Sequence, residues 1–139
     1  MVKEIVKDVE VLSKPCDKAT IDDMGIVDDL METAASMEDV AGLSANQIGE
    51  TKCIAIYLDD KDEFKTVFNP KLVKALYPVK MEEECFSVDG AHKVTRFECA
   101  TIAYEEPVDG KLVARKREFH GRESQILQHV IDHCKGKVI

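Results

Sequence analysis

The sequence has no uninterrupted apolar run that approaches the length needed to span a bilayer, and its first residues lack the apolar core of a signal peptide. We therefore expect a protein that makes no use of a membrane and resides in the cytoplasm. Long polar or repetitive tracts, which would stay disordered, are also lacking. A chain of 139 residues can bury about two-thirds of its unfolded surface, so we predict a single domain over residues 1–139.

Basic residues are in short supply, because 19 Lys and Arg stand against 27 Asp and Glu and the formal net charge is -8 at pH 7. Affinity for a polyanion comes largely from Lys and Arg that neutralise phosphates, so we expect no direct nucleic-acid binding. A disulfide framework is not expected either, since the five cysteines are an odd number at irregular spacings. A cysteine with a special role is then a metal ligand or a nucleophile.

Hydrophobic periodicity and turn residues predict an α+β domain in which a helix, several mostly antiparallel strands and a second helix follow one another. The first twenty residues should form an extended arm and a loop, because Pro15 interrupts regular structure. Thr20 is placed to cap a helix whose apolar residues recur from 24 to 35. The other expected elements are strands at 53–58, at 64–68 ending at Asn69-Pro70, at 94–104 and at 111–119, and a final helix at 123–134.

Residues 42–49, with the sequence GLSANQIG, consist mainly of small side chains and amides. Taken alone, such a segment is typical of a surface loop. Small side chains also allow a backbone to approach another strand or a ligand closely, and Gly49 permits a turn conformation. Both interpretations stay open from this segment by itself.

The clearest chemical signal is the sequence QHVIDH at residues 128–133. On a helix, His129 and His133 project from the same face one turn apart, so both imidazoles can bind one metal ion. Because an H-x-x-x-H spacing also arises by chance, the pair alone leaves a metal site and two structural histidines equally open. Cys85 is the best candidate for a third ligand, since a thiolate with two imidazoles leaves a position for water or substrate. The alternative is that Cys85 is simply a small buried residue.

Val130 follows the first histidine, where the H-E-x-x-H metallohydrolase motif has the glutamate that serves as general base. An isopropyl group neither accepts nor delivers a proton. Val130 could be an ordinary core residue, but the helix face that carries it also carries the histidines, so its side chain should line the site. The sequence therefore predicts a metal site without its usual proton shuttle. We expect the two other histidines, His92 and His120, at the surface.

Three segments together resemble, in order and approximate spacing, the signature motifs of the peptide deformylases. They are GLSANQIG at 42–49, EECFS at 83–87 and QHVIDH at 128–133, against the family patterns G-x-G-L-A-A-x-Q-x-G, E-G-C-L-S and Q-H-E-x-D-H. The resemblance implies mostly antiparallel sheets packed around a C-terminal metal-binding helix. It also implies an activity, the hydrolytic removal of the formyl group from the N-terminal methionine of new polypeptides.

The resemblance also implies which residues would form the site. Cys85, His129 and His133 would hold one divalent metal ion, usually Fe2+ in the family, with Zn2+ or Ni2+ able to occupy the same place. The amide of Gln47 and the backbone N–H of Phe86 would meet the oxyanion that develops when water attacks the formyl carbon.

On the substrate side, the resemblance implies that the backbone around Gly42 and Leu43 pairs with an extended peptide as an added strand. Glu83 would pair with Arg96 and hold the loop that carries the cysteine, a structural role.

Three residues depart from the family pattern. Val130 replaces the general base, whose assistance is commonly worth about a hundred- to ten-thousandfold, so we expect very low activity. Glu84 replaces the glycine before the cysteine, and Val40 stands where the family has its first glycine, so both bear on substrate binding. Glu84 is a poor substitute base, because adjacent side chains on an extended strand face opposite ways.

The sequence leaves three functions to weigh. The first is a deformylase with weak or absent activity. The second is a non-catalytic binder that uses the metal and the cleft to hold a formylated or otherwise modified peptide N-terminus, or a small acid. The third is an interaction domain with no metal at all.

Overall fold

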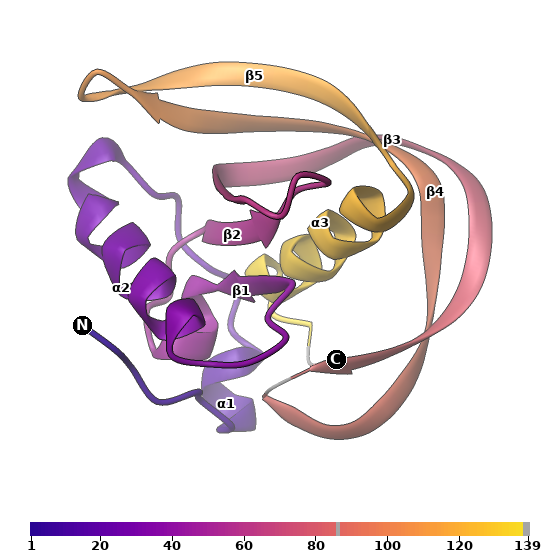
Figure 1. The fold of residues 1–139 in the computed structure, drawn as a ribbon, viewed down its shortest axis with the longest axis horizontal. Coiled ribbons are helices and arrows are strands. Elements are labelled where there is room, and N and C mark those ends of the chain that lie inside the picture. Colours follow the sequence, from indigo (N-terminus) through magenta and orange to yellow (C-terminus); the bar gives the residue numbers. More distant parts are fainter. Residues whose placement is uncertain (86, 138–139) are drawn as a thin grey trace.

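The computed structural model describes residues 1–85 and 87–137, which form one five-stranded sheet with helices on its two sides. All neighbouring strands are antiparallel, in the order β1-β2-β3-β4-β5. Figure 1 shows helix α3 at the centre, with the long, curved strands β3, β4 and β5 wrapped around it. The predicted α+β class and the central C-terminal helix are therefore confirmed. The elements are α1 Val9–Leu12, η1 Ile21–Asp23, α2 Met24–Ala35, β1 Gly42–Ser44, η2 Ala45–Ile48, β2 Ile54–Leu58, β3 Phe64–Cys85, β4 Val88–Val108, β5 Lys111–His120 and α3 Gly121–Cys134.

Strand β2 lies between two hydrophobic cores, which explains why it is apolar on both faces. Ile54 and Ile56 belong to the core that contains Leu30 of α2, whereas Ala55 and Tyr57 belong to the core under α3. Successive side chains of a strand point to opposite faces, so one short strand serves both cores. Both apolar faces are removed from water, and helix α3 is thereby fixed against the sheet.

The N-terminal region differs in part from the sequence prediction. Residues 9–12 form a single helical turn inside the expected extended arm, because the side chain of Asp8 accepts a hydrogen bond from the backbone N–H of Glu10 at 2.9 Å. The prediction that Thr20 caps the next helix is confirmed: Thr20 and Asp23 form a reciprocal capping box. None of the helices in the described ranges is both long and apolar enough to cross a membrane.

The prediction that a strand ends at Asn69-Pro70 is wrong, since β3 continues from Phe64 to Cys85. Asn69 has a φ of 51° and the register with β4 shifts between Phe68 and Lys71, so the two residues form a β-bulge. A proline fits there because a bulge does not need its N–H. The side chain of Asn69 supplies the missing pairing, binding the backbone N–H and carbonyl of Ala19 at 2.8 and 2.9 Å.

Residues 42–49 are not the surface loop that their composition favoured. Gly42 to Ser44 pair with β2, and the following turn of η2 is buried and ends at Gly49, whose φ of 89° confirms the predicted turn conformation. A Cβ atom at Gly42 would lie 3.0 Å from Cγ2 of Ile126 and 3.1 Å from Cγ1 of Val130. The small residue therefore lets β1 approach α3 closely.

Replacing Gly42 by alanine should destabilise the protein by about 1–3 kcal/mol, because the added methyl group overpacks the contact with α3. The control is Gly25→Ala in α2, where an added Cβ meets nothing within 4 Å and should raise stability by about 0.5–1 kcal/mol. Midpoints of urea unfolding measure both changes. Equal stability of Gly42→Ala and the parent would show that the close approach is not required.

Candidate metal centre and substrate cleft

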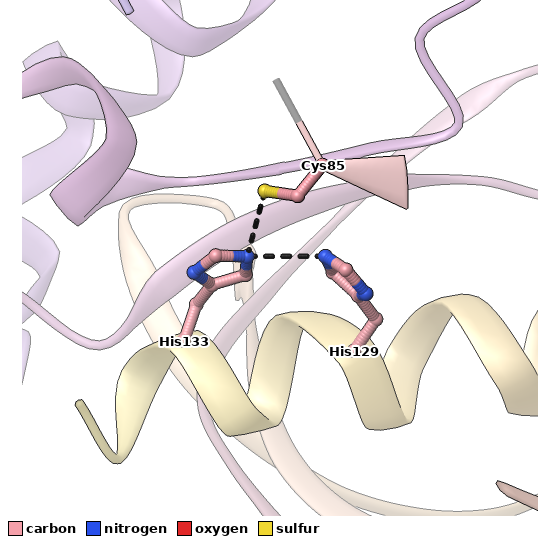
Figure 2. A group of neighbouring side chains, drawn as sticks. All are labelled: Cys85, His129 and His133. Atoms are coloured by element: carbon pink, nitrogen blue, oxygen red, sulfur yellow. Dashed lines mark hydrogen bonds between the residues drawn. The ribbon is translucent and has the colours of Figure 1, made fainter. Parts of the chain in front are cut away.

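Cys85, His129 and His133 come together at the centre of the molecule, the first from the end of β3 and the two histidines from one face of α3. Figure 2 shows the thiol above the two rings. The Sγ of Cys85 lies 3.3 Å from Nε2 of His133, which lies 3.1 Å from Nε2 of His129. All three donor atoms are within 4.8 Å of one another.

These distances fit a metal ion. Thiolate and imidazole ligands bound at about 2.0–2.3 Å around a tetrahedral ion lie roughly 3.3–3.7 Å apart, close to the observed spacing. Three side-chain donors leave the fourth position for water or substrate, as in catalytic rather than structural sites. The donor set of one thiolate and two imidazoles suits Fe2+, Zn2+ or Ni2+ better than Mg2+ or Ca2+.

Glu83 holds the ring of His129 in the orientation that a ligand needs. Nδ1 of His129 donates a hydrogen bond to Glu83 at 2.9 Å, which leaves Nε2 facing Cys85 and His133. The predicted pair of Glu83 with Arg96 is confirmed, with contacts of 2.7 to 3.1 Å, and Arg96 also donates to Asp132 at 2.6 Å. Arg96 and Glu83 are both buried, so the charges are removed from water together.

Electrostatics favour the ionised forms of these groups. Burial raises the pKa of the Cys85 thiol, but interactions with His129 and His133 outweigh it and lower the pKa to about 5. For His129, burial lowers the pKa, whereas the neighbouring Cys85 and Glu83 raise it to about 9. Cys85 is therefore a thiolate at neutral pH, the form that binds metals. His129 must lose its extra proton before Nε2 can serve as a ligand.

Gln47 lies beside the thiolate and is almost fully buried, at 2% exposure. Its Oε1 accepts a hydrogen bond from the backbone N–H of Ser44 at 3.0 Å, which fixes the amide orientation. Its Nε2 then points toward Cys85 Sγ and Ser87 Oγ, each at 3.3 Å. A donor in this position can meet negative charge that develops next to Cys85.

A cavity of about 550 Å³ opens beside Cys85 and His129, and Val130 forms part of its wall. Val130 is 1% exposed and also belongs to the core under α3. The wall further includes Gly42, Gln47, Cys85 and His129. The residue that stands in place of a general base thus faces the cavity with an apolar group.

The structure separates the residues expected on the substrate side. Gly42 and Glu84 line the cavity, whereas the side chains of Val40 and Leu43 are buried in the core with α2. The side chain of Val40 packs under α2 and does not line the cavity, so its expected effect on substrate binding stays a prediction. Leu43 can contact a ligand only through its backbone. The expected donor Phe86 lies outside the described residues.

Several supporting contacts were not foreseen from the sequence. Gln128 accepts a hydrogen bond from the backbone N–H of Phe97 and donates one to its carbonyl, both at 2.9 Å. These two bonds connect α3 to β4. Gln125 donates to Glu83 at 3.0 Å, and Asn46 donates to the carbonyl of His133 at 2.9 Å. Gln125 lies one helical turn before His129, and that spacing was the available signal for its role.

The family model for polypeptide deformylases matches residues 2–139. Peptide deformylase of Clostridium beijerinckii is 36% identical over 140 residues, covering 100% of both chains. Peptide deformylase 3 of Shewanella oneidensis is 32% identical over 136 residues, covering 96% of this chain and 75% of its own. A solved structure of a peptide deformylase from Legionella pneumophila superposes with a TM-score of 0.86 at 27% identity, covering 99% of this chain and 83% of its own. The chain belongs to the polypeptide deformylase family, a metal-dependent family that removes N-formyl groups from nascent peptides.

Proposed function

We propose that this protein binds the formylated N-terminus of a peptide in the cavity over a metal centre, and that it hydrolyses the formyl group weakly or not at all. Cys85, His129 and His133 are the proposed ligands of one divalent metal ion, Fe2+ in the cell, with Zn2+ or Ni2+ as substitutes. Residues 1–139 are proposed to form a single domain. A cytoplasmic location stays a prediction from the sequence.

The side chain of Val130 is the observation that carries this proposal. It faces the cavity next to His129 and has no group that can exchange a proton. The nearby carboxylate of Glu83 is not free to replace it, because Arg96, Gln125 and His129 all donate to it. Burial raises the pKa of Glu83, but these partners outweigh burial and lower it to about 2, so it does not take up a proton at neutral pH.

The remaining chemistry is divided among the residues of the cavity. A bound divalent ion would supply Lewis-acid activation of water and of the formyl oxygen. Gln47 would donate a hydrogen bond from Nε2 to a formyl oxygen that lies beside Cys85. Val130 would exclude water from the side of the site where proton transfer is needed, which favours binding over turnover.

The charge of the cavity favours a peptide over a small acid. Its wall contains Glu38, Asp39 and three consecutive glutamates at 82–84, while Arg122 is the only Lys or Arg among its described lining residues. A free carboxylate would meet like charges on entry. A peptide with a neutral formylated end does not carry that cost.

The proposal is tested by measuring binding and hydrolysis of one formyl-Met peptide by the Fe2+- or Ni2+-loaded protein. We expect the peptide to bind in calorimetry while kcat/KM remains at least about a hundredfold below that of a Val130→Glu variant. Turnover by the native protein as fast as by that variant would overturn the claim that Val130 impairs catalysis. Absence of peptide binding by the metal-loaded protein would overturn the proposed ligand.

Removing the thiolate should remove the metal. Protein purified without oxygen is expected to contain about one metal ion per chain, and Cys85→Ala close to none, because two imidazoles alone are a poor site. Cys16→Ser, another half-buried thiol, is the control and should keep its metal. Elemental analysis gives both numbers. Stoichiometric metal in Cys85→Ala would contradict the proposed ligand set.

A further inference from the structure

A second group of donor side chains lies on the outer side of the β4–β5 ladder, away from the cavity. Among the described residues, Cys99, Glu118 and His120 bring a sulfur, an oxygen and a nitrogen within 4.8 Å of one another. None of the three residues lines the cavity over Cys85 or contacts its ligands. From the sequence, His120 is expected only at the surface, and its side chain is 62% exposed.

The sheet itself sets this group in place. Cys99 of β4 and His120 of β5 are direct cross-strand partners, so their side chains leave the same face of the sheet. Glu118 lies two residues before His120 on β5 and therefore shares that face. The side chains of Glu118 and His120 are 58% and 62% exposed, so an ion can reach them from solvent.

The imidazole of His120 has the orientation expected of a metal ligand, with one ring nitrogen near a thiol and the other near a carboxylate. Its Nδ1 lies 3.1 Å from Cys99 Sγ, and its Nε2 lies 3.1 Å from Oε1 of Glu118. The Glu118 carboxylate lies at ion-pair distance from Nε2, which favours a proton on Nε2 and leaves the lone pair of Nδ1 directed at the thiol. A histidine that binds a metal almost always donates its other N–H to such a partner.

We propose that Cys99 and His120 form a second metal site, for Zn2+ or another borderline-soft divalent ion, with Glu118 as the residue that positions His120. A thiolate and an imidazole favour Zn2+ over Mg2+ or Ca2+, which prefer oxygen ligands. Water completes the coordination, so the site is weaker than the three-ligand centre at Cys85. The metal replaces the thiol proton, which is released to solvent.

A metal at this site would tie β4 to the start of α3. His120 is the last residue of β5 and the N-cap residue of α3, and its side chain makes no capping hydrogen bond. An ion shared with Cys99 would therefore cross-link the ladder at the point where the chain enters the helix that carries His129 and His133. Zn2+ at this site should raise the Tm, because it binds the folded chain and not the unfolded one.

The test is a titration of Zn2+ into the metal-free full chain, in competition with a chelating indicator. We expect one tight and one weaker event. Cys99→Ser and His120→Gln should each abolish only the weaker event, and Cys85→Ala only the tight one, so the two sites are judged separately. Glu118→Gln should retain the weaker event with about ten- to a hundredfold lower affinity.

Cobalt gives a second measurement, which identifies the ligand by its absorption. Co2+ bound by Cys99 should add a thiolate-to-cobalt absorption band in Cys85→Ala, and this band should be lost in the double variant Cys85→Ala/Cys99→Ser. Circular dichroism checks that each variant is folded. A single binding event in the native chain, or a weaker event that survives both Cys99→Ser and His120→Gln, would overturn the second site.

Discussion

Replacing Val130 by glutamate is expected to raise kcat/KM for hydrolysis of a formyl-Met peptide about a hundred- to ten-thousandfold. The new carboxylate would lie in the wall of the cavity that also contains Gln47 and Cys85, next in sequence to His129. It would accept a proton from the attacking water and return it to the leaving amine, two transfers for which valine has no group. The measurement is initial rates with the Fe2+- or Ni2+-loaded variant and parent.

The matched control is Val130→Gln, which has the same length and shape as the glutamate variant without a basic group. It should bind metal and peptide like Val130→Glu and show none of its gain. Metal content and unfolding midpoints must be compared as well, because Val130 also contacts the region of Gly42 and Ile126. If Val130→Glu binds metal and gains nothing, the substrate side is altered too, and Glu84→Gly becomes the next variant to combine with it.

Replacing Arg96 by methionine is expected to cost about 3–5 kcal/mol of folding stability, because it leaves the buried carboxylate of Glu83 without its guanidinium partner. Arg96 is 5% exposed and donates to Glu83 of β3 and to Asp132 of α3. A single substitution therefore removes one hydrogen-bonding partner from each of these carboxylates. Urea unfolding at neutral pH measures the loss. Metal affinity should fall at the same time, since Glu83 also holds His129.

A surface pair on the same sheet provides the control for Arg96. Arg115 contacts Glu106 at 2.6 Å, but the two side chains are 44% and 36% exposed. Arg115→Met should therefore change stability by about 0–1 kcal/mol. Similar losses for the two variants would mean that burial of the Arg96 network does not matter, and the structural role assigned to Glu83 would then be wrong.

Local signals in the sequence were sufficient for the elements whose ends are set by local chemistry. The cap at Thr20 and the final helix each depend on residues a few positions apart, and the structure has both. The end expected at Asn69-Pro70 failed for the opposite reason. There the deciding partner is Ala19, fifty residues away, whose backbone satisfies Asn69 so that β3 can continue.

The same distinction applies to the site. Helical spacing proposes His129 and His133, thiolate chemistry adds Cys85 as the third candidate ligand, and the order of three motifs adds Gln47. The positions of the elements that carry these side chains depend on contacts that no single segment reveals, such as Arg96 reaching Asp132 or Asn46 donating to the carbonyl of His133. Val40 lies next to a motif in the sequence, but that position does not indicate which hydrophobic core its side chain enters. In the structure it packs in the core that contains α2.

The central position of α3 has a consequence for how the protein is made. The strands β1 to β5 are all synthesised before this helix, yet it is α3 that covers their inner face and supplies both histidines (Figure 1). Until residues 121–134 have left the ribosome, the nascent chain exposes the apolar, concave face of the sheet that α3 later covers. Metal loading must therefore follow translation of the helix, and truncation before Gly121 should give an aggregating product rather than a smaller folded one.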